Sequence, residues 1–233
     1  MPTAIITGAS RGLGRALAEG LAADGWQLVL DARHRADLDA VAAELSTTTT
    51  VVAVAGDVTD PDHRSALAAA AARLDGAGLL VNNASRLGPS PLPPLALHPL
   101  DELTTVYATN VVAPLGLAQL VLPQLEDHGG AIVNVTSDAA VEAYPGWGGY
   151  GSSKAALEQA SAVLAAEHPG LRVWWVDPGD LRTAMHQDAF PGEDISDRPL
   201  PATVVPAFVH LVRSRPPSGR IRAGDLAVTG EVG

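Results

Sequence analysis

The sequence predicts an α/β fold in which one parallel sheet is covered by helices on both faces. Short apolar runs, rich in β-branched residues, alternate along the chain with segments whose apolar residues recur at helical spacing. The runs are continuously apolar, as expected for strands buried on both faces of a parallel sheet. At 233 residues the chain has a length that doubly wound folds often reach as one domain. We therefore expect a single domain over residues 1–233, built as a three-layer αβα sandwich.

The expected elements alternate regularly. The first strand is predicted at residues 3–7 and leads through a glycine turn into a helix that starts near Arg15. Proline-rich residues 89–94 indicate an excursion after the fourth strand. The further strands are predicted at 27–32, 51–55, 78–82, 131–136 and 171–177, with a seventh near Ile221, and the further helices at 36–45, 61–74, between 99 and 126, at 150–167 and at 202–213.

The composition is that of a globular protein, with 47% hydrophobic and 18% charged residues. The net charge of −11 opposes nucleic-acid binding, because a phosphate backbone is held mainly by clustered lysine and arginine. We see no run of about 18 uncharged apolar residues that suggests a membrane span, and no basic, apolar leader. Cysteine is absent, which excludes disulfides and thiol catalysis. We expect a cytoplasmic protein without nucleic-acid or membrane partners.

The histidines do not form a metal-binding pattern. They are scattered along the chain and lack the i, i+4 pairing of a helical zinc motif. We therefore assign no metal.

A glycine-rich turn follows the first predicted strand. Gly8, Gly12 and Gly14 allow a tight turn and a close approach of the backbone, and exposed amides at a helix N-terminus attract a pyrophosphate. The spacing is Gly-x-x-x-Gly-x-Gly, and an ordinary strand-to-helix turn is the alternative interpretation. A dinucleotide is the ligand that this turn indicates.

Tyr150 and Lys154 stand four residues apart in a predicted helix, so both lie on one face of it. A free tyrosine has a pKa of about 10 and is a poor acid or base near neutrality, whereas a nearby cation favours the phenolate. The pair is therefore a candidate proton donor and acceptor, although an exposed pair on a helix is usually only solvated.

Further motifs stand around this pair in a fixed order. They are Thr7-Gly-Ala-Ser-Arg-Gly-Leu-Gly14, Asp57-Val58, Asn82-Asn-Ala-Ser85, Asn110, Ser137, Tyr150-x-x-x-Lys154 and Pro178-Gly-Asp-Leu-Arg-Thr183. In order and approximate spacing they resemble the short-chain dehydrogenase/reductase family in its compact single-domain form. The chain departs from the family at Ser85, where glycine is usual, and in a slightly shorter total length. The resemblance implies a Rossmann-type fold with a seven-stranded parallel sheet of order 3-2-1-4-5-6-7.

The resemblance also implies a role for each catalytic candidate. Tyr150 would give a proton to a substrate carbonyl, and Lys154 would lower the tyrosine pKa and bond the nicotinamide ribose. Ser137 would hold the carbonyl oxygen and Asn110 would anchor a water, although each alone would be read as an ordinary polar residue.

The resemblance places the cofactor in one crevice. Asp57 would accept a bond from the adenine amine, with a helix cap before Pro61 as the alternative interpretation. The implied cofactor-binding residues are Gly8, Ser10, Arg11, Gly12, Leu13, Gly14, Arg33, Asp57, Val58, Asn83, Ala84, Ser85, Tyr150, Lys154, Pro178, Gly179, Leu181 and Thr183.

The end of the second strand decides which dinucleotide is bound. An acidic side chain there binds the ribose hydroxyls of NAD and repels the 2′-phosphate of NADP, whereas arginine pairs with that phosphate. The family's NAD-selecting position falls on Ala32 and its NADP-selecting arginine on Arg33, and Arg11 adds a second positive charge. NADP(H) is therefore predicted, although a shift of one residue onto Asp31 would reverse the choice to NAD(H).

The resemblance implies an NADPH-dependent reductase of small or medium-sized ketones or aldehydes. An alcohol-oxidising dehydrogenase would use the same residues in reverse, and a non-catalytic nucleotide sensor would keep the fold for binding alone. Residues 183–200 lack clear periodicity and are expected to form a substrate lid. Tyr144, Trp147 and Met185 are the candidate substrate contacts, with simple loop packing as the alternative for Trp147.

The helices around residues 115–125 and 155–166 carry apolar or small residues on more than one face. Pairing of such helices across a twofold axis gives a four-helix bundle, as in relatives. A homodimer or homotetramer is therefore expected.

Overall fold

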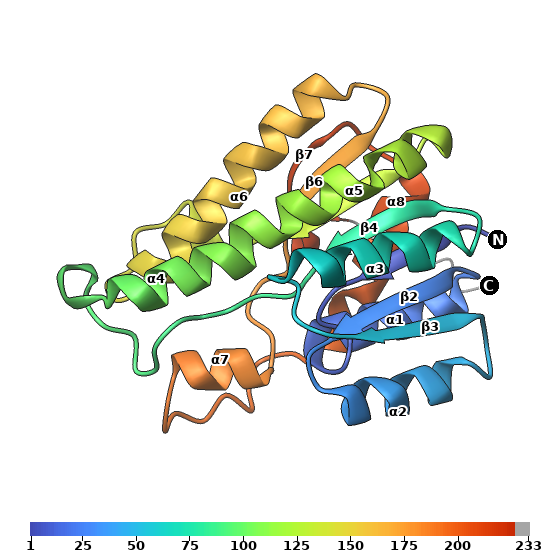
Figure 1. Ribbon diagram of the computed structural model, residues 1–233. Helices are drawn as coiled ribbons and strands as arrows, with labels where there is room; N and C mark the ends of the chain where they lie inside the picture. The colour runs from blue at the N-terminus through green and yellow to red at the C-terminus, as the bar shows by residue number, and fades with distance from the viewer. Residues whose placement is uncertain (227–233) are drawn as a thin grey trace.

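The computed structural model describes residues 1–226 as a seven-stranded sheet with helices on both faces (Figure 1). All neighbouring strands pair in parallel in the order β3-β2-β1-β4-β5-β6-β7, which confirms the predicted fold class and strand order. Residues 227–233 of the predicted domain lie outside the described part. The strands are β1 (Thr3–Ile6), β2 (Gln27–Ala32), β3 (Val51–Ala55), β4 (Ala77–Asn82), β5 (Ala131–Val135), β6 (Arg172–Asp177) and β7 (Gly219–Arg222).

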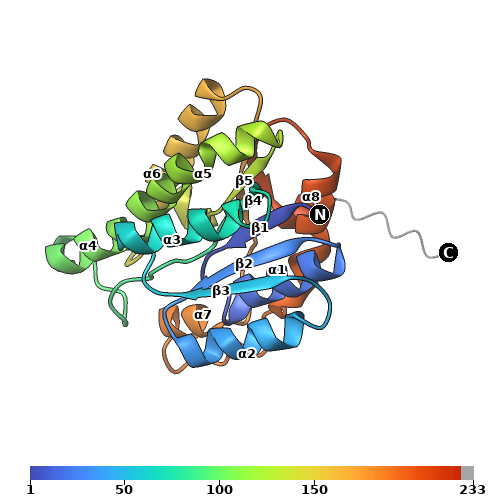
Figure 2. The same cartoon turned by 45° about the vertical axis from the view of Figure 1, so that its right-hand side comes forward.

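The helices form two layers, with α1, α2 and α8 on one face of the sheet and α3, α5 and α6 on the other. In both views α4 extends away from the sheet at one end of the molecule (Figure 2). The helices are α1 (Gly12–Ala23), α2 (Arg35–Leu45), α3 (Pro61–Ala72), α4 (Leu100–Tyr107), α5 (Ala113–Asp127), α6 (Gly148–Glu167), α7 (Ala184–Ala189) and α8 (Val205–Ser214), with short helical turns η1 (Leu95–Leu97), η2 (Ala108–Val112), η3 (Asp138–Ala140), η4 (Pro201–Val204) and η5 (Ala223–Asp225).

The sheet separates two apolar core layers. On β2, Leu28 and Leu30 pack into one layer and Val29 packs into the other. Because successive side chains of a strand point to opposite faces, a strand covered on both faces needs apolar residues at successive positions. Each fully buried leucine or valine contributes about 1.5–3 kcal/mol to stability. The continuous apolar runs of the sequence are thus explained by two-sided burial.

Strand β1 ends at Ile6, one residue earlier than predicted, because Thr7 turns to bond the loop after β4. Its hydroxyl accepts hydrogen bonds from the backbone N–H groups of Asn83 and Ala84, each at 3.0 Å. The Asn83 side chain donates in return to the Thr7 carbonyl at 2.9 Å. These bonds bring the glycine turn and the Asn-Asn-Ala-Ser segment side by side.

The segment Leu100–Asp127 is one continuous helix made of α4, the π-helical turn η2 and α5. It is long and apolar enough to cross a membrane by length and composition alone, a property that core helices share. Sequence inspection did not single it out, because polar residues are spread among its apolar ones. Leu117, Val121 and Leu125 are buried in the core layer beneath the helix. Part of its apolar composition therefore serves packing on the sheet.

Candidate active site

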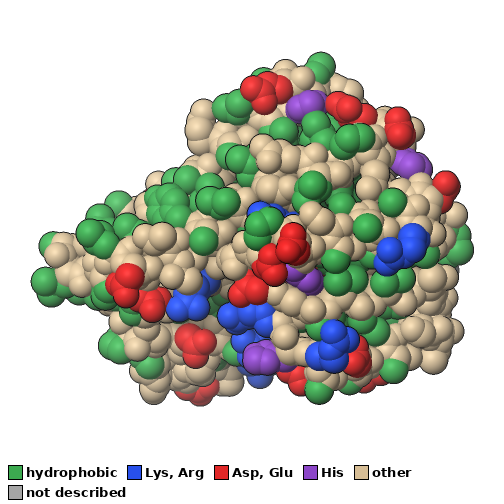
Figure 3. All heavy atoms as spheres, viewed as in Figure 1, with side chains coloured by type: hydrophobic (Ala, Val, Ile, Leu, Met, Phe, Trp, Pro, Cys, Tyr) green, Lys and Arg blue, Asp and Glu red, His purple; other side chains and the backbone are tan. Residues whose placement is uncertain are grey.

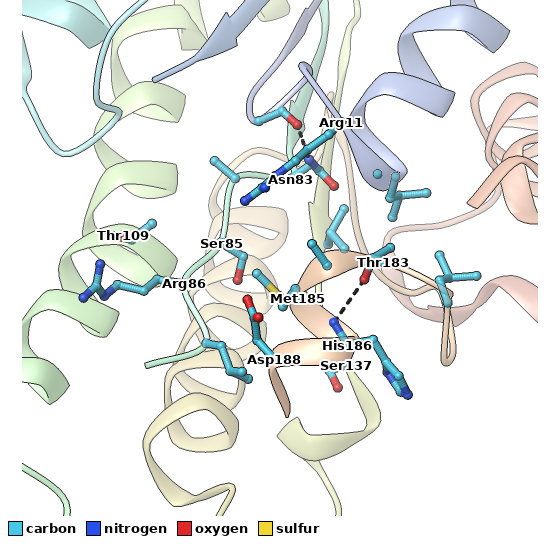
Figure 4. Close-up of a pocket in the computed structure, with 18 of the residues that line it drawn as sticks. Arg11, Asn83, Ser85, Arg86, Thr109, Ser137, Thr183, Met185, His186 and Asp188 are labelled. Atoms are coloured by element: carbon cyan, nitrogen blue, oxygen red, sulfur yellow. Dashed lines mark hydrogen bonds between the residues drawn. The ribbon is translucent and has the colours of Figure 1, made fainter. Parts of the chain in front are cut away.

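A cavity of about 680 Å³ lies at the carboxyl ends of the strands, where doubly wound sheets bind ligands. Figure 4 shows Ser85, Ser137 and Met185 around one space, although they come from the loops after β4 and β5 and from α7. Of the predicted cofactor-binding residues, Gly14 lies outside the lining. Those that line the cavity are Gly8, Ser10, Arg11, Gly12, Leu13, Arg33, Asp57, Val58, Asn83, Ala84, Ser85, Tyr150, Lys154, Pro178, Gly179, Leu181 and Thr183.

The glycine turn has the shape that a pyrophosphate requires. Gly8 has a φ of +67°, and a Cβ there would lie 3.0 Å from Ala84 Cα. Helix α1 begins at Gly12, and its N-cap residue, Arg11, makes no side-chain capping bond, so the first amides of the helix are open to an anion. Gly14 instead packs beneath the turn, where a side chain would overlap the Gly8 carbonyl. The turn therefore fits a dinucleotide.

Asp57, the second residue after β3, lines the cavity and does not cap α3. The cap is Asp60, whose side chain accepts a bond of 2.9 Å from the Asp62 N–H. Asp57 Oδ1 accepts bonds from the N–H and the hydroxyl of Thr59, both at 2.8 Å. Although burial acts to raise it, these bonds hold the pKa of Asp57 below its ordinary value. A carboxylate thus lines the cavity, and its bond to the adenine amine stays a prediction.

Tyr150 and Lys154 lie one turn apart near the start of α6. Both are buried, with exposed fractions of 9% and 2% respectively. Lys154 Nζ lies 5.5 Å from the centroid of the Tyr150 ring. It also donates a hydrogen bond of 2.8 Å to the Val135 carbonyl at the end of β5. The structure thus brings the predicted pair together in the cavity wall.

Burial controls the proton affinity of this pair. It raises the pKa of Tyr150 above its ordinary value, while the hydroxyls of Ser85 and Ser137 act in the opposite direction. Burial lowers the pKa of Lys154 to about 8. In the protein alone the phenol is therefore neutral, which suits a proton donor. That Lys154 lowers the tyrosine pKa stays a prediction, and the contacts of this structure favour the neutral phenol.

Ser137 follows β5, and its neighbours orient its hydroxyl. Oγ donates a bond of 2.9 Å to Asp138 Oδ1 and accepts one of 3.2 Å from the Ala139 N–H. Asp138 Oδ2 accepts a bond of 3.1 Å from the Tyr144 hydroxyl. Tyr144 is exposed and lies outside the cavity lining. The structure therefore gives Tyr144 a contact with Asp138 and not the predicted position in the substrate cavity.

Asn110 is fully buried in the π-helical turn. Its Oδ1 accepts bonds from the Ser85 hydroxyl at 3.2 Å and the Arg86 N–H at 2.8 Å. Its Nδ2 donates to the Arg86 carbonyl and to the Ser153 hydroxyl, each at 2.9 Å. These bonds occupy both donor hydrogens of the amide and hold the loop after β4 against α6. The water-anchoring role of Asn110 stays a prediction.

Ser85 stands where the family usually has glycine, and it makes more contacts than that single difference suggested. Its hydroxyl bonds Asn110 and also acts against the rise that burial causes in the pKa of Tyr150. The departure from glycine therefore adds a hydroxyl between a buried amide and the phenol.

A charged cluster behind Ser137 escaped sequence reasoning. Arg220 of β7 donates a bond of 3.1 Å to the Ser137 carbonyl. Its guanidinium also pairs with Glu158 at 3.0 Å and with Asp177 at 3.1 Å. Asp177 Oδ1 in turn accepts a bond of 3.0 Å from the Gly179 N–H. Glu158 stands one turn beyond the Tyr–Lys pair, a spacing that could have indicated it, but no local pattern marks Arg220.

An aromatic wall borders the cavity beside Tyr150. The Trp147 ring centroid lies 5.8 Å from that of Tyr150 and 5.9 Å from that of Phe190, a residue of the segment predicted as the lid. Trp147 and Met185 line the cavity. Their contact with a substrate stays a prediction.

The segment 183–200 contains α7, which lies beside the cavity. Thr183 caps this helix, and its hydroxyl accepts a bond of 3.2 Å from the His186 N–H (Figure 4). A helix thus occupies part of the segment for which a lid without clear periodicity was predicted.

The cavity combines a glycine turn that fits a dinucleotide with a buried proton donor. Together they define an oxidoreductase of alcohol or carbonyl groups, and comparison with known proteins supports this class. The family model for short chain dehydrogenases matches residues 2–194. Serine 3-dehydrogenase of Rhizobium radiobacter is 32% identical over 235 residues, which cover 96% of this chain and 92% of that protein. Sepiapterin reductase of Meriones unguiculatus is 36% identical over 197 residues, which cover 78% and 75%.

Similarity to solved structures supports the same class of protein. A short-chain dehydrogenase of Shigella flexneri complexed with NADP has a TM-score of 0.88 at 28% identity, covering 96% of this chain and 97% of that one. The chain therefore belongs to the short-chain dehydrogenase/reductase family. It is an NAD(P)-dependent oxidoreductase that acts on alcohol or carbonyl groups.

Proposed function

We propose that this protein reduces a small or medium-sized ketone or aldehyde with NADPH. The observation that carries this function is the buried, neutral phenol of Tyr150 in the cavity wall, because carbonyl reduction needs a proton donor. NADPH, when bound, supplies the hydride. Oxidation of an alcohol would use the same residues in reverse, and the cofactor preference and the cellular redox ratio, not the site, decide the direction.

Three of the four catalytic candidates have distinct tasks in this function. Ser137 turns its hydroxyl from Asp138 to the substrate oxygen and holds that oxygen near the phenol. Tyr150 gives its proton to the same oxygen as negative charge develops there. The Lys154 ammonium stabilises the phenolate that remains and donates to the nicotinamide ribose.

The charges around the adenosine end of the cavity support NADP(H) as the cofactor. Arg11 and Arg33 both line it, and Figure 3 shows basic side chains gathered on this part of the surface, between α7 and α2. A guanidinium binds a phosphate through charge-assisted bonds. The Shigella flexneri neighbour complexed with NADP is consistent with this choice.

Arg33→Ala is expected to lower kcat/KM with NADPH by about 10-fold or more, because a hydrogen bond to a charged group contributes about 1.5–3 kcal/mol. kcat/KM with NADH should change little. The measurement is steady-state kinetics with both cofactors, and Arg35→Ala serves as the control, because Arg35 lies two residues away and outside the cavity lining. Equal losses with both cofactors, or wild-type kinetics that favour NADH, would count against the NADP assignment.

The substrate side supports an apolar or aromatic carbonyl compound, because Trp147 and Met185 line it beside Tyr150. We assign the segment 183–200 as the lid over this side. A panel of ketones and aldehydes, followed through loss of NADPH absorbance, tests the function directly. Tight NADPH binding without turnover across the panel would favour the non-catalytic sensor.

We also propose that the protein forms a homodimer or larger assembly and is located in the cytoplasm. Large apolar side chains are exposed over the long helices, and Figure 3 shows hydrophobic side chains gathered over the region of α4. Exposed apolar patches of this kind mark association surfaces. The residues are Leu95, Leu97, Leu100, Val112, Leu115, Leu120 and Val163.

Leu115→Glu is expected to convert the assembly into monomers at micromolar concentration, because it places a charge in the paired helices. Sedimentation velocity measures the change. Leu200→Glu, which alters an exposed leucine away from these helices, is the control and should leave the assembly intact. A wild-type protein that sediments as a monomer would refute the assembly.

A further inference from the structure

Asp31 and His63 form a buried pair at the wall of the cavity. Asp31 is the residue before the last in β2, and His63 lies in the first turn of α3. His63 Nε2 lies 2.6 Å from Asp31 Oδ1, and the exposed fractions of the two side chains are 7% and 2%. Asp31 Oδ2 accepts a bond of 3.3 Å from the Gly8 N–H in the glycine turn. Each carboxylate oxygen therefore has a partner within the protein.

The surrounding residues are shaped for this pair. Gly56, directly after β3, leaves room for the imidazole, because any side chain there would overlap the His63 ring. Asp31 points towards α3 because side chains alternate along β2, and its neighbours Leu30 and Ala32 belong to the opposite core layer. The imidazole thus lies against Gly56 and faces the Asp31 carboxylate.

The position of Asp31 gives the pair a functional meaning. Asp31 and Arg33 line the same part of the cavity, two residues apart. A free carboxylate at the end of the second strand binds the ribose hydroxyls of NAD and repels the 2′-phosphate of NADP. Burial raises the pKa of Asp31, while the bond to His63 and its charge act in the opposite direction. His63 is therefore the partner that occupies an acidic group able to compete with Arg33.

We propose that His63 is a positioning residue for dinucleotide choice: it holds Asp31 against α3, so that Arg33 and not a carboxylate meets the 2′-position of the ribose. This assignment rests on the proposed preference for NADP(H). It also explains how a chain with Asp31 beside the selecting position keeps that preference.

The test compares the dissociation constants of NADP⁺ and NAD⁺, measured by titration calorimetry without substrate. His63→Ala releases the carboxylate, and the ratio of the two constants is expected to move towards NAD⁺ by roughly tenfold, the order of effect of one nearby charge at a partly screened site. His63→Ala combined with Asp31→Asn should restore the wild-type preference, because the released group then carries no charge. A merely structural role of His63 would weaken both cofactors alike, and Asp31→Asn would not rescue it.

Two further variants keep the outcome decisive. His63→Gln retains a donor at the place of Nε2, and its ratio should lie closer to wild type than that of His63→Ala; it also serves if the alanine variant does not fold. His168→Ala is the matched control, because it removes another histidine–carboxylate contact, 2.9 Å to Glu126, remote from the cavity. An unchanged ratio in folded His63→Ala overturns the role of His63. A wild-type protein that binds NAD⁺ more tightly contradicts the proposed cofactor, whatever the variants do.

Discussion

Replacing Tyr150 with phenylalanine is expected to lower kcat by roughly 10²–10⁴-fold, the range over which a positioned general acid accelerates a reaction. The substitution keeps the ring that packs against Trp147 at 5.8 Å and removes only the hydroxyl that carries the proton. The measurement is turnover of a confirmed carbonyl substrate, alongside NADPH affinity from fluorescence titration. Because the loss concerns proton transfer, kcat should fall far more than NADPH affinity.

Tyr107→Phe is the control for this variant, because it removes a tyrosine hydroxyl at the end of α4, outside the cavity lining. Its kcat should match that of the wild type. A Tyr150→Phe enzyme that retains wild-type turnover would refute the proposed mechanism, since no other phenol lines the cavity within residues 1–226.

Replacing Lys154 with methionine is expected to lower kcat/KM by about 100-fold or more and to weaken NADPH binding as well. The methionine stem fills the same buried space, but the bond to the Val135 carbonyl and the cation beside the phenol are lost. The double effect separates this variant from Tyr150→Phe, in which cofactor affinity persists. Unchanged NADPH affinity would argue against a bond from Lys154 to the nicotinamide ribose.

The lysine also predicts a pH dependence. Its pKa is lowered to about 8, so the ammonium is present below that pH and is lost as the pH rises through it. Because the cation stabilises the phenolate formed during reduction, kcat/KM should fall above about pH 8, and kcat/KM reports the groups of the free enzyme. Lys154 is the only lysine in the sequence. Protein labelled at the lysine ε-position therefore gives one side-chain resonance, whose titration by NMR measures this pKa directly.

Local patterns sufficed for much of the fold and of the site. Continuous apolar runs, a glycine turn and the Tyr150–Lys154 spacing are each contained in a short stretch of chain, and each lies where the sequence placed it. The contacts that escaped prediction join distant segments. Asp31 meets His63 across 32 positions, and no periodicity connects the two. The direction of the Tyr150 pKa also escaped, because it depends on burial, which only the packed structure defines.

The sequence predicted roles for Asn110 and Tyr144 but not their local hydrogen-bond partners. The family resemblance implied a water-binding Asn110, whereas the amide in this structure is engaged by Ser85, Arg86 and Ser153. The clustering of Tyr144, Trp147 and Tyr150 within seven residues predicted Tyr144 beside the substrate, whereas its hydroxyl bonds Asp138 outside the cavity lining. In both cases the partners are polar groups brought close by the loops after β4 and β5, whose paths the motifs alone do not specify.

Arg220 is synthesised later than the other residues of the site that it supports. The guanidinium that holds the Ser137 carbonyl comes from a residue 83 positions later, on the strand at one edge of the sheet. A chain emerging from the ribosome has made the glycine turn, the serine, the tyrosine and the lysine before this strand exists. The proposed reaction centre is therefore finished only when β7 docks beside β6, and the onset of turnover would report that the last strand has folded into place.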